Sequence, residues 1–226
     1  MDRQLVYPGQ IPLETDMLST NKNAMVAFGM LAQDLIGSAT QAAGFTCTQN
    51  SPAAMSVLLT PGRIYSLQSI DATAYSSLAA DTTHQLLKQG ILLDAVTLAC
   101  GAPSTAGYSI NYLIQAAYQD GDSGAVTLPY YNASNPTQGY SGPGGSGASQ
   151  STVRKGLVSA TAKAGIAATT GTQATPAADA GYIGLFVVTV ANGASTITSG
   201  NISAYAGAPF VASLPVASTS TPLSPS

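Results

Sequence analysis

Apolar side chains recur at every second position between residues 109 and 119, which is the period of a β-strand and not of a helix. This run predicts a strand whose apolar face carries Ile110, Tyr112, Ile114, Ala116 and Tyr118. The opposite face would carry Ser109, Asn111, Gln115 and Gln119. From residue 44 onward most of the chain follows this period, so we expect a mainly β fold.

Further segments have the composition of short strands, namely residues 55–60, 63–67, 91–98 and 157–163. Residues 182–190 are almost continuously apolar, which is typical of a central strand buried on both faces. Many short strands separated by Gly, Pro and Asn favour an antiparallel β-sandwich or an open barrel. The sequence leaves the choice between sandwich and barrel open.

Two turns are expected between these strands. Asn192-Gly193 is a strong hairpin signal and would lead the chain into a strand over residues 195–198. Thr60-Pro61-Gly62 combines a residue with fixed φ and a flexible glycine, which favours a turn.

The N-terminal segment differs from the rest of the chain. Residues 1–18 contain Pro8 and Pro12 and have no period, which predicts an extended arm. One short helix should follow, with an N-cap at Ser19 or Thr20 and an end at Gly37. Its narrow apolar seam would consist of Leu18, Met25, Phe28, Ala32 and Leu35. The seam could pack on the chain's own β-domain or lie at a subunit interface, and the pattern leaves both open.

We therefore expect three regions: a docking arm and helix over residues 1–40, a β-domain over residues 41–210, and a Ser/Thr/Pro-rich tail over residues 211–226. A Gly/Ser loop without apolar residues occupies positions 132–151. Loops of that length are usually functional or disordered.

The low charge content restricts the function. Charged residues make up 8% of the chain, with 7 Lys and Arg against 10 Asp and Glu, so a basic surface for nucleic acid is not expected. The sequence has no apolar run long enough for a membrane helix. Residues 1–10 lack the apolar core of a signal peptide, and we expect synthesis in the cytoplasm without membrane insertion.

Two cysteines, Cys47 and Cys100, are too few for a zinc site or a disulfide framework. Both lie in apolar or Thr-rich surroundings, so we interpret them as buried thiols. Their redox state is left open by the sequence.

Residues 121–124 read Gly-Asp-Ser-Gly, which resembles the surroundings of a chymotrypsin-like nucleophile. His84, Asp94 and Ser123 also occur in the chain order of that triad, but His84 is too close to Ser123 in the sequence to come from a separate barrel. We instead predict a polar turn over residues 119–124, in which the side chains of Asp120 and Asp122 bond to nearby backbone. No phosphate-binding or dinucleotide motif occurs. We expect neither an enzyme nor a cofactor or metal.

Three tyrosines, Tyr130, Tyr131 and Tyr140, flank the Gly/Ser loop. Exposed aromatic rings can stack on sugars, so they could bind a host surface glycan. The alternative is that they pack at strand ends or at a subunit seam, with their hydroxyls in water.

Several segments together resemble tail-fibre and baseplate-associated proteins of tailed bacteriophages. They are residues 1–16 with the following Asn-Lys-Asn-Ala-Met at 21–25, and then 61–67, 75–85, 112–120 and 128–132. The resemblance covers roughly residues 1–210 and includes no catalytic motif, so it assigns no functional residue.

The resemblance implies a virion structural protein of the tail or baseplate region, a fibre-like or adaptor subunit that is a homotrimer. Its partners would be other tail or baseplate proteins, bound through the N-terminal arm. It would be made in the host cytoplasm and reside in the tail of the virion. The alternative is an adhesin of the tail, that is, a receptor-binding protein that contacts the host surface.

Overall fold

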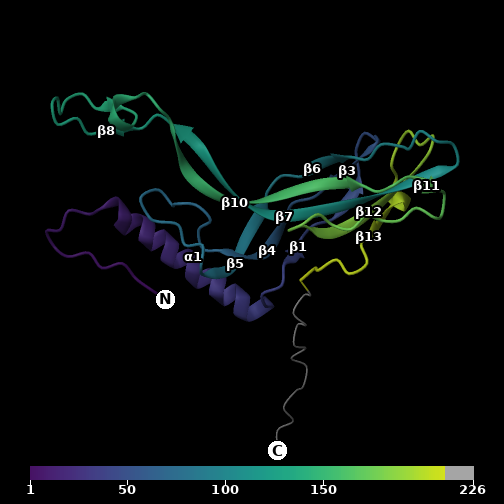
Figure 1. Cartoon of the computed structure of the whole chain (residues 1–226), viewed down its shortest axis with the longest axis horizontal. Coiled ribbons are helices and arrows are strands. Elements are labelled where there is room, and N and C mark those ends of the chain that lie inside the picture. The colour runs from purple at the N-terminus through teal and green to yellow at the C-terminus, as the bar shows by residue number, and fades with distance from the viewer. Residues whose placement is uncertain (212–226) are drawn as a thin grey trace, which may run out of the picture.

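The structure is a computed structural model, and it describes residues 1–211 (Figure 1). Within these residues the chain is mainly β with one α-helix near the N-terminus. The elements are α1 (Glu14–Ile36), β1 (Gln41–Ala43), β2 (Cys47–Gln49), β3 (Ser56–Leu59), β4 (Gly62–Ser69), β5 (Gln85–Leu92), β6 (Val96–Ala99), β7 (Tyr108–Val126), β8 (Pro129–Tyr130), β9 (Tyr140–Ser141), η1 (Pro143–Gly145), β10 (Gln150–Ala164), β11 (Ala168–Thr169), β12 (Ile183–Ala191), η2 (Ser199–Asn201) and β13 (Ile202–Ala204).

Helix α1 is longer than the sequence suggested, with 23 residues. The predicted start at Ser19 or Thr20 is wrong, because the Asp16 side chain accepts a 2.9 Å hydrogen bond from the Leu13 backbone and starts the helix earlier. The predicted end is confirmed. Gly37 has a φ of 82° and its N–H donates to the Gln33 carbonyl over 2.8 Å, a conformation that favours glycine.

The main sheet is strongly curled and has the strand order β1-β4-β5-β10-β7-β12-β13, with β11 added to β7 (Figure 1). All these pairs are antiparallel except β5 with β10, which pair in parallel at Ile91 and Leu157. The outer edge of β1 is met by residues 209–211: the Ala42 N–H donates to the Pro209 carbonyl and the Val211 N–H donates to the Ala42 carbonyl, each over 2.8 Å. The predicted mainly β fold of the open barrel or sandwich type is confirmed, with this one parallel pair in addition.

Two glycines allow β5 and β10 to cross. A Cβ atom on Gly90 would lie 2.5 Å from the Leu157 carbonyl oxygen, and one on Gly156 would lie 2.4 Å from the Gln89 carbonyl oxygen. Both contacts are with backbone atoms, which cannot move aside. The close approach of the two strands therefore requires residues without side chains.

A smaller sheet of order β2-β3-β6 packs with the main sheet around a shared core. The fully buried side chains of this core come from both sheets and from Ile197, which follows β12. The largest are Leu59, Ile64, Ile114, Leu185, Ile197, Val57, Val188 and Val190. Cys100 lies in the core and Cys47 packs against it, and burial raises their pKa values to about 12 and about 11.

The predicted strand over residues 109–119 is confirmed as part of β7, and its polar face is buried at Ser109, Asn111 and Gln115 but exposed at Gln119. Gln115 is 1% exposed. Its side-chain amide donates to Asp179 over 2.5 Å and its carbonyl accepts from the Asp179 backbone over 2.9 Å. Asn111 donates to Thr175 over 3.1 Å. The segment after β11 thus covers this face and satisfies its amides.

The other strand predictions are confirmed for β3, β4 and β10. The predicted strand over residues 91–98 is wrong, since it spans the end of β5, a turn and the start of β6. Residues 182–190 form β12, which lies between β7 and β13 as a central strand. Asn192-Gly193 does form a turn, but the predicted strand over residues 195–198 is wrong. The next strand is β13, which pairs antiparallel with β12 on the side away from β7.

The predicted polar turn over residues 119–124 is also wrong. These residues continue β7, where Asp120 pairs with Gly156 and Asp122 with Arg154 of β10. Asp120 and Asp122 bind cations of neighbouring strands instead of nearby backbone. The long partner strand outweighs the turn-forming tendency of Asp and Gly in this segment.

Beyond the main sheet, β7 and β10 continue as a two-stranded ribbon that projects from the molecule and ends in the β8–β9 hairpin (Figure 1). The predicted Gly/Ser loop forms most of this tip, together with η1. No helix within residues 1–211 is long and apolar enough to cross a membrane. The predicted tail over residues 211–226 lies outside the described residues, except for Val211.

Candidate functional site

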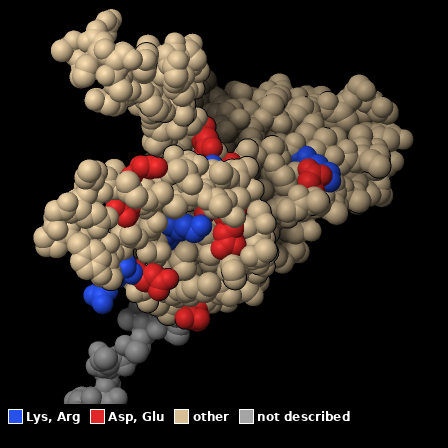
Figure 2. Space-filling view, turned by 60° about the vertical axis from the view of Figure 1, so that its left-hand side comes forward, with Lys and Arg blue, Asp and Glu red and all other residues tan. Residues whose placement is uncertain are grey.

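Charged side chains gather at one place although the chain has few of them. Figure 2 shows a surface that is mostly uncharged, with several blue and red groups close together on one lobe. Six charged residues connect α1, β5, β7, β10 and the segment after β4 through ion pairs. They are Lys22, Asp71, Lys88, Asp120, Asp122 and Arg154, and we call them the charge cluster.

The innermost pair of the charge cluster joins β5 to β7. The Lys88 side chain is only 4% exposed, and its ammonium lies 2.8 Å from Asp120. The Tyr118 hydroxyl donates to the other oxygen of Asp120 over 2.5 Å. Burial and the nearby Asp120 carboxylate raise the pKa of Tyr118, so its hydroxyl stays protonated and donates. The buried ammonium is thus neutralised in place.

Arg154 binds two regions at once. Its guanidinium donates to both carboxylate oxygens of Asp122, over 2.7 and 3.0 Å, and to the carbonyl oxygens of Thr73 and Ala74, over 3.1 and 3.0 Å. This fork lowers the pKa of Asp122 and raises that of Arg154. Arg154 also lies 5.7 Å from the centre of the Tyr75 ring. It fixes the segment between β4 and β5 onto the ribbon.

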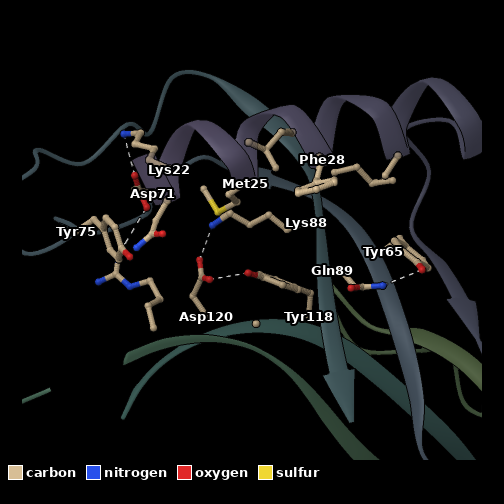
Figure 3. Close-up of a pocket in the computed structure, with 17 residues that line it drawn as sticks. Lys22, Met25, Phe28, Tyr65, Asp71, Tyr75, Lys88, Gln89, Tyr118 and Asp120 are labelled. Carbon is tan, nitrogen blue, oxygen red and sulfur yellow. Dashed lines mark hydrogen bonds and ion pairs between the residues drawn. The ribbon is translucent and has the colours of Figure 1, made fainter. Parts of the chain in front are cut away.

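A groove of about 440 Å³ lies between α1 and the main sheet, beside the charge cluster (Figure 3). The helix side is mainly apolar and includes Met25, Phe28 and Ala32. The opposite side carries Leu86, Leu87, Tyr65, Tyr118 and the paired charges of Lys88 and Asp120. The Gln89 amide donates to the Tyr65 hydroxyl over 2.8 Å along the same wall.

Helix α1 is held close to the sheet by two contacts. Lys22 forms a 2.9 Å ion pair with Asp71, whose side chain is 4% exposed. Two turns further along the same side, a Cβ atom on Gly29 would lie 2.3 Å from Leu86 Cδ1 and 3.0 Å from the Leu87 carbonyl oxygen. The glycine lets the helix backbone approach β5 directly.

The three cations and three aspartates of the cluster neutralise one another, and their ion pairs hold neighbouring elements together. We interpret the role of the cluster as structural. Each of its three cations lies against an aspartate. The cluster contains no nucleophile next to a base and no pair of facing carboxylates. Within residues 1–211, no group of three or more His, Cys, Asp or Glu side chains could hold a metal ion.

The five predicted seam residues do not act as one surface. Met25 and Ala32 line the groove together with Phe28, and Leu18 is half-buried. Phe28 and Leu35 are about 70% exposed, at 72% and 70%. The sequence pattern therefore mixed side chains that face the chain's own sheet with side chains that face away from it.

The arm before α1 folds back along the helix. The side-chain amides of Gln4 and Gln10 donate to the carboxylate of Asp16, over 2.9 and 3.4 Å. Met1 lies beside Met30 and Leu31 of the helix. The arm thus has polar anchors, while its own apolar side chains Leu5 and Ile11 remain exposed.

The three predicted tyrosines do come together at the tip of the ribbon. Tyr130 of β8 and Tyr140 of β9 are directly opposite each other. Tyr130 donates a hydrogen bond to Gln150, and the Tyr140 ring packs against Gly145. Tyr131 is 78% exposed.

The residues of the protease-like pattern are placed differently from a catalytic triad. His84 binds Asp81 over 3.0 Å at the surface, and hydrogen bonds from the His84 backbone and ring lower the pKa of Asp81 to about 2. Ser123 lies within β7, and its buried hydroxyl has no hydrogen-bond partner. Asp94 lies in the turn between β5 and β6.

Sequence reasoning missed the charge cluster. One signal for it was present: Lys88 directly follows two leucines in a strand-like segment, and a lysine buried there needs an anionic partner. The identity of that partner, 32 residues later in the chain, had no local signal.

No protein family model, curated protein or solved structure matches this chain.

Proposed function

We propose that this chain is a structural protein of the bacteriophage virion, a homotrimeric fibre-like or adaptor subunit of the tail or baseplate region. It attaches to the tail machinery through its arm and α1, which together we call the N-terminal surface (residues 1–36). It is made in the host cytoplasm and becomes part of the tail. The resemblance of its sequence segments to such proteins suggests the class, and the exposed apolar side chains of residues 1–36 suggest the mode of attachment.

The distribution of exposed apolar side chains carries this proposal. Eleven of the 21 exposed large apolar side chains of residues 1–211 lie in residues 1–35. Soluble proteins rarely expose contiguous apolar surface of this kind unless it binds a partner. The remaining ten are spread over the rest of the described chain, which has its own core.

Incorporation into particles tests the proposal. We expect the double variant Leu5→Ser, Ile11→Ser to be incorporated at least tenfold less than the natural chain, because both side chains are exposed and available to a partner. Quantitative mass spectrometry of purified particles measures the copy number. The control is Leu93→Ser, Ile166→Ser, which changes two equally exposed side chains outside the N-terminal surface. Normal incorporation of the Leu5, Ile11 variant would contradict the proposal.

A second candidate function is that of a host-binding adhesin. The observation that favours it is the tip, where three tyrosines gather at the end of a projecting ribbon (Figure 1). Aromatic rings exposed at a protruding tip can stack on the sugars of a host surface glycan.

Tyr131 separates this candidate from the first, because its ring is the most exposed of the three. If the tip binds a glycan, Tyr131→Ala should reduce adsorption of particles to host cells at least fivefold, whereas Tyr131→Phe should retain most of it through its ring. Copy number in the particle should stay the same in both variants. Unchanged adsorption by Tyr131→Ala would reject the adhesin.

A further inference from the structure

An uncharged stripe runs along the outer side of α1. It consists of Met17, Asn21, Ala24, Phe28, Leu31 and Leu35, and we call it the α1 stripe. Five of these residues are exposed and Ala24 is half-buried. Their spacings of four and three alternate over the whole stripe, which is the heptad spacing by which helices pack side by side.

The stripe is fixed in place on the molecule. The Lys22–Asp71 ion pair and the close contact at Gly29 fix how the helix is turned. Met25 and Ala32 face the groove, Asn21 and Phe28 also line it but remain exposed, and the other stripe residues do not line it. The start of the arm runs along the other side of the stripe, where Met1 lies beside Leu31. A partner helix would therefore meet a rigid surface bounded by the groove and the arm.

Charge favours a second copy of the same helix as the occupant. The stripe has no charged residue, and of the helix positions that flank it (18, 20, 25, 27, 32 and 34) only Asp34 is charged. Lys22 is paired with Asp71. Two copies can therefore approach without the like-charge repulsion that a charged face would cause. A partner with a charged surface would find no opposite charge on this stripe to pair with.

Asn21 favours a parallel arrangement in register. It is the one amide in an otherwise apolar stripe, at a position that faces the partner. A single asparagine buried between two helices lowers the stability of their association unless its amide meets another polar group. It therefore favours the register in which such a group lies opposite. Parallel copies in register place Asn21 against Asn21, where the two amides can bond to each other.

The available area is sufficient only when the arm takes part. The four exposed apolar side chains of the α1 stripe are 55–72% exposed and the six of the arm are 51–86% exposed. At about 150 Å² for each fully exposed side chain, the stripe offers on the order of 400 Å² and the stripe with the arm about 1,000 Å². A stable interface buries about 800 Å² on each partner.

We infer that the α1 stripe, together with the arm, is a self-association surface that binds α1 of a second copy in parallel and in register at Asn21. This inference rests on the proposed function, in which the chain is an oligomeric subunit, and it names the surface that joins the copies. Tail proteins other than this chain would then bind to the assembled helices and not to the stripe itself.

Sedimentation equilibrium of the purified chain tests the surface. The natural chain should associate at micromolar concentration, and Phe28→Ser, Leu35→Ser should raise the dissociation constant at least tenfold. The Leu93→Ser, Ile166→Ser control should associate like the natural chain. Circular dichroism verifies that each variant is folded, which is expected because the four side chains are exposed.

Cysteine cross-linking tests the register. Asn21→Cys should form a disulfide between copies under mild oxidation, whereas Met30→Cys, on another side of the helix, should not. The native Cys47 and Cys100 contribute little background because burial raises their pKa values to about 11 and about 12.

Each outcome decides the inference. Association that Phe28→Ser, Leu35→Ser weakens, with a cross-link at residue 21, supports it. A natural chain that is monomeric at all concentrations overturns it, as does association that the double substitution leaves unchanged. A missing cross-link at residue 21 in an associated chain overturns the parallel register. Detection of the natural chain in purified particles judges the virion role separately, since a chain that is monomeric in solution could still enter the particle.

Discussion

At the scale of single residues, the charge cluster shows what the sequence could and could not predict. Lys88 follows two leucines, and a lysine that is buried in such a segment needs an anionic partner. Asp120 was interpreted as a turn residue, since Asp-Gly is common in turns. The pairing of these two residues depends on how β5, β10 and β7 lie side by side, which no local pattern contains.

We predict that Asp120→Asn destabilises the fold by about 2–4 kcal/mol, because it leaves the ammonium of Lys88 buried without a counter-charge. Lys88→Met should cost less, since Asp120 is partly exposed and keeps the hydrogen bond from Tyr118. The double variant should cost less than the sum of the two single variants. Urea unfolding at one fixed protein concentration measures all three.

The matched control for this pair is Lys163→Met. Lys163 forms a 2.6 Å ion pair with Asp179, but both side chains are substantially exposed, so its loss should cost less than about 1 kcal/mol. Equal losses for Lys163→Met and Asp120→Asn would show that burial of the Lys88 ammonium has no special cost, and would contradict the structural role of the charge cluster.

At the scale of elements, strands were easier to predict than the surfaces that they bury. The period of two in β7 was visible because neighbouring residues of a strand point to opposite faces. The burial of Gln115 and Asn111 was not, because the segment that covers them comes much later in the chain. Residues 119–124 show the same limit, as strand pairing with β10 overrides a local turn tendency.

Helix α1 illustrates a related ambiguity. An apolar residue every three or four positions predicts a helix, but Phe28 and Leu35 fit both the predicted seam and the α1 stripe. The contact of Gly29 with Leu86 fixes which side of the helix faces the sheet. A glycine within a helix indicates that another segment could approach closely at that point. The sequence does not show that this segment is β5.

At the scale of the whole molecule, two exposed surfaces project from one folded β-domain. Within residues 1–211, the N-terminal surface carries eleven of the 21 large exposed apolar side chains, and the tip of the ribbon carries the three tyrosines. The charge cluster lies between them and connects α1, the segment after β4, and the base of the ribbon. We interpret the molecule as a unit stabilised by the charge cluster, which attaches to its partners through the N-terminal surface and exposes the tip of the ribbon.

The central claim is that this chain is a subunit of the virion tail, and the copy number in purified particles tests it most directly. Quantitative mass spectrometry of particles from the source lysate should detect the chain at a copy number divisible by three, as expected for a homotrimer. Particles that lack the chain would contradict the account. A copy number that is not a multiple of three would contradict the trimer.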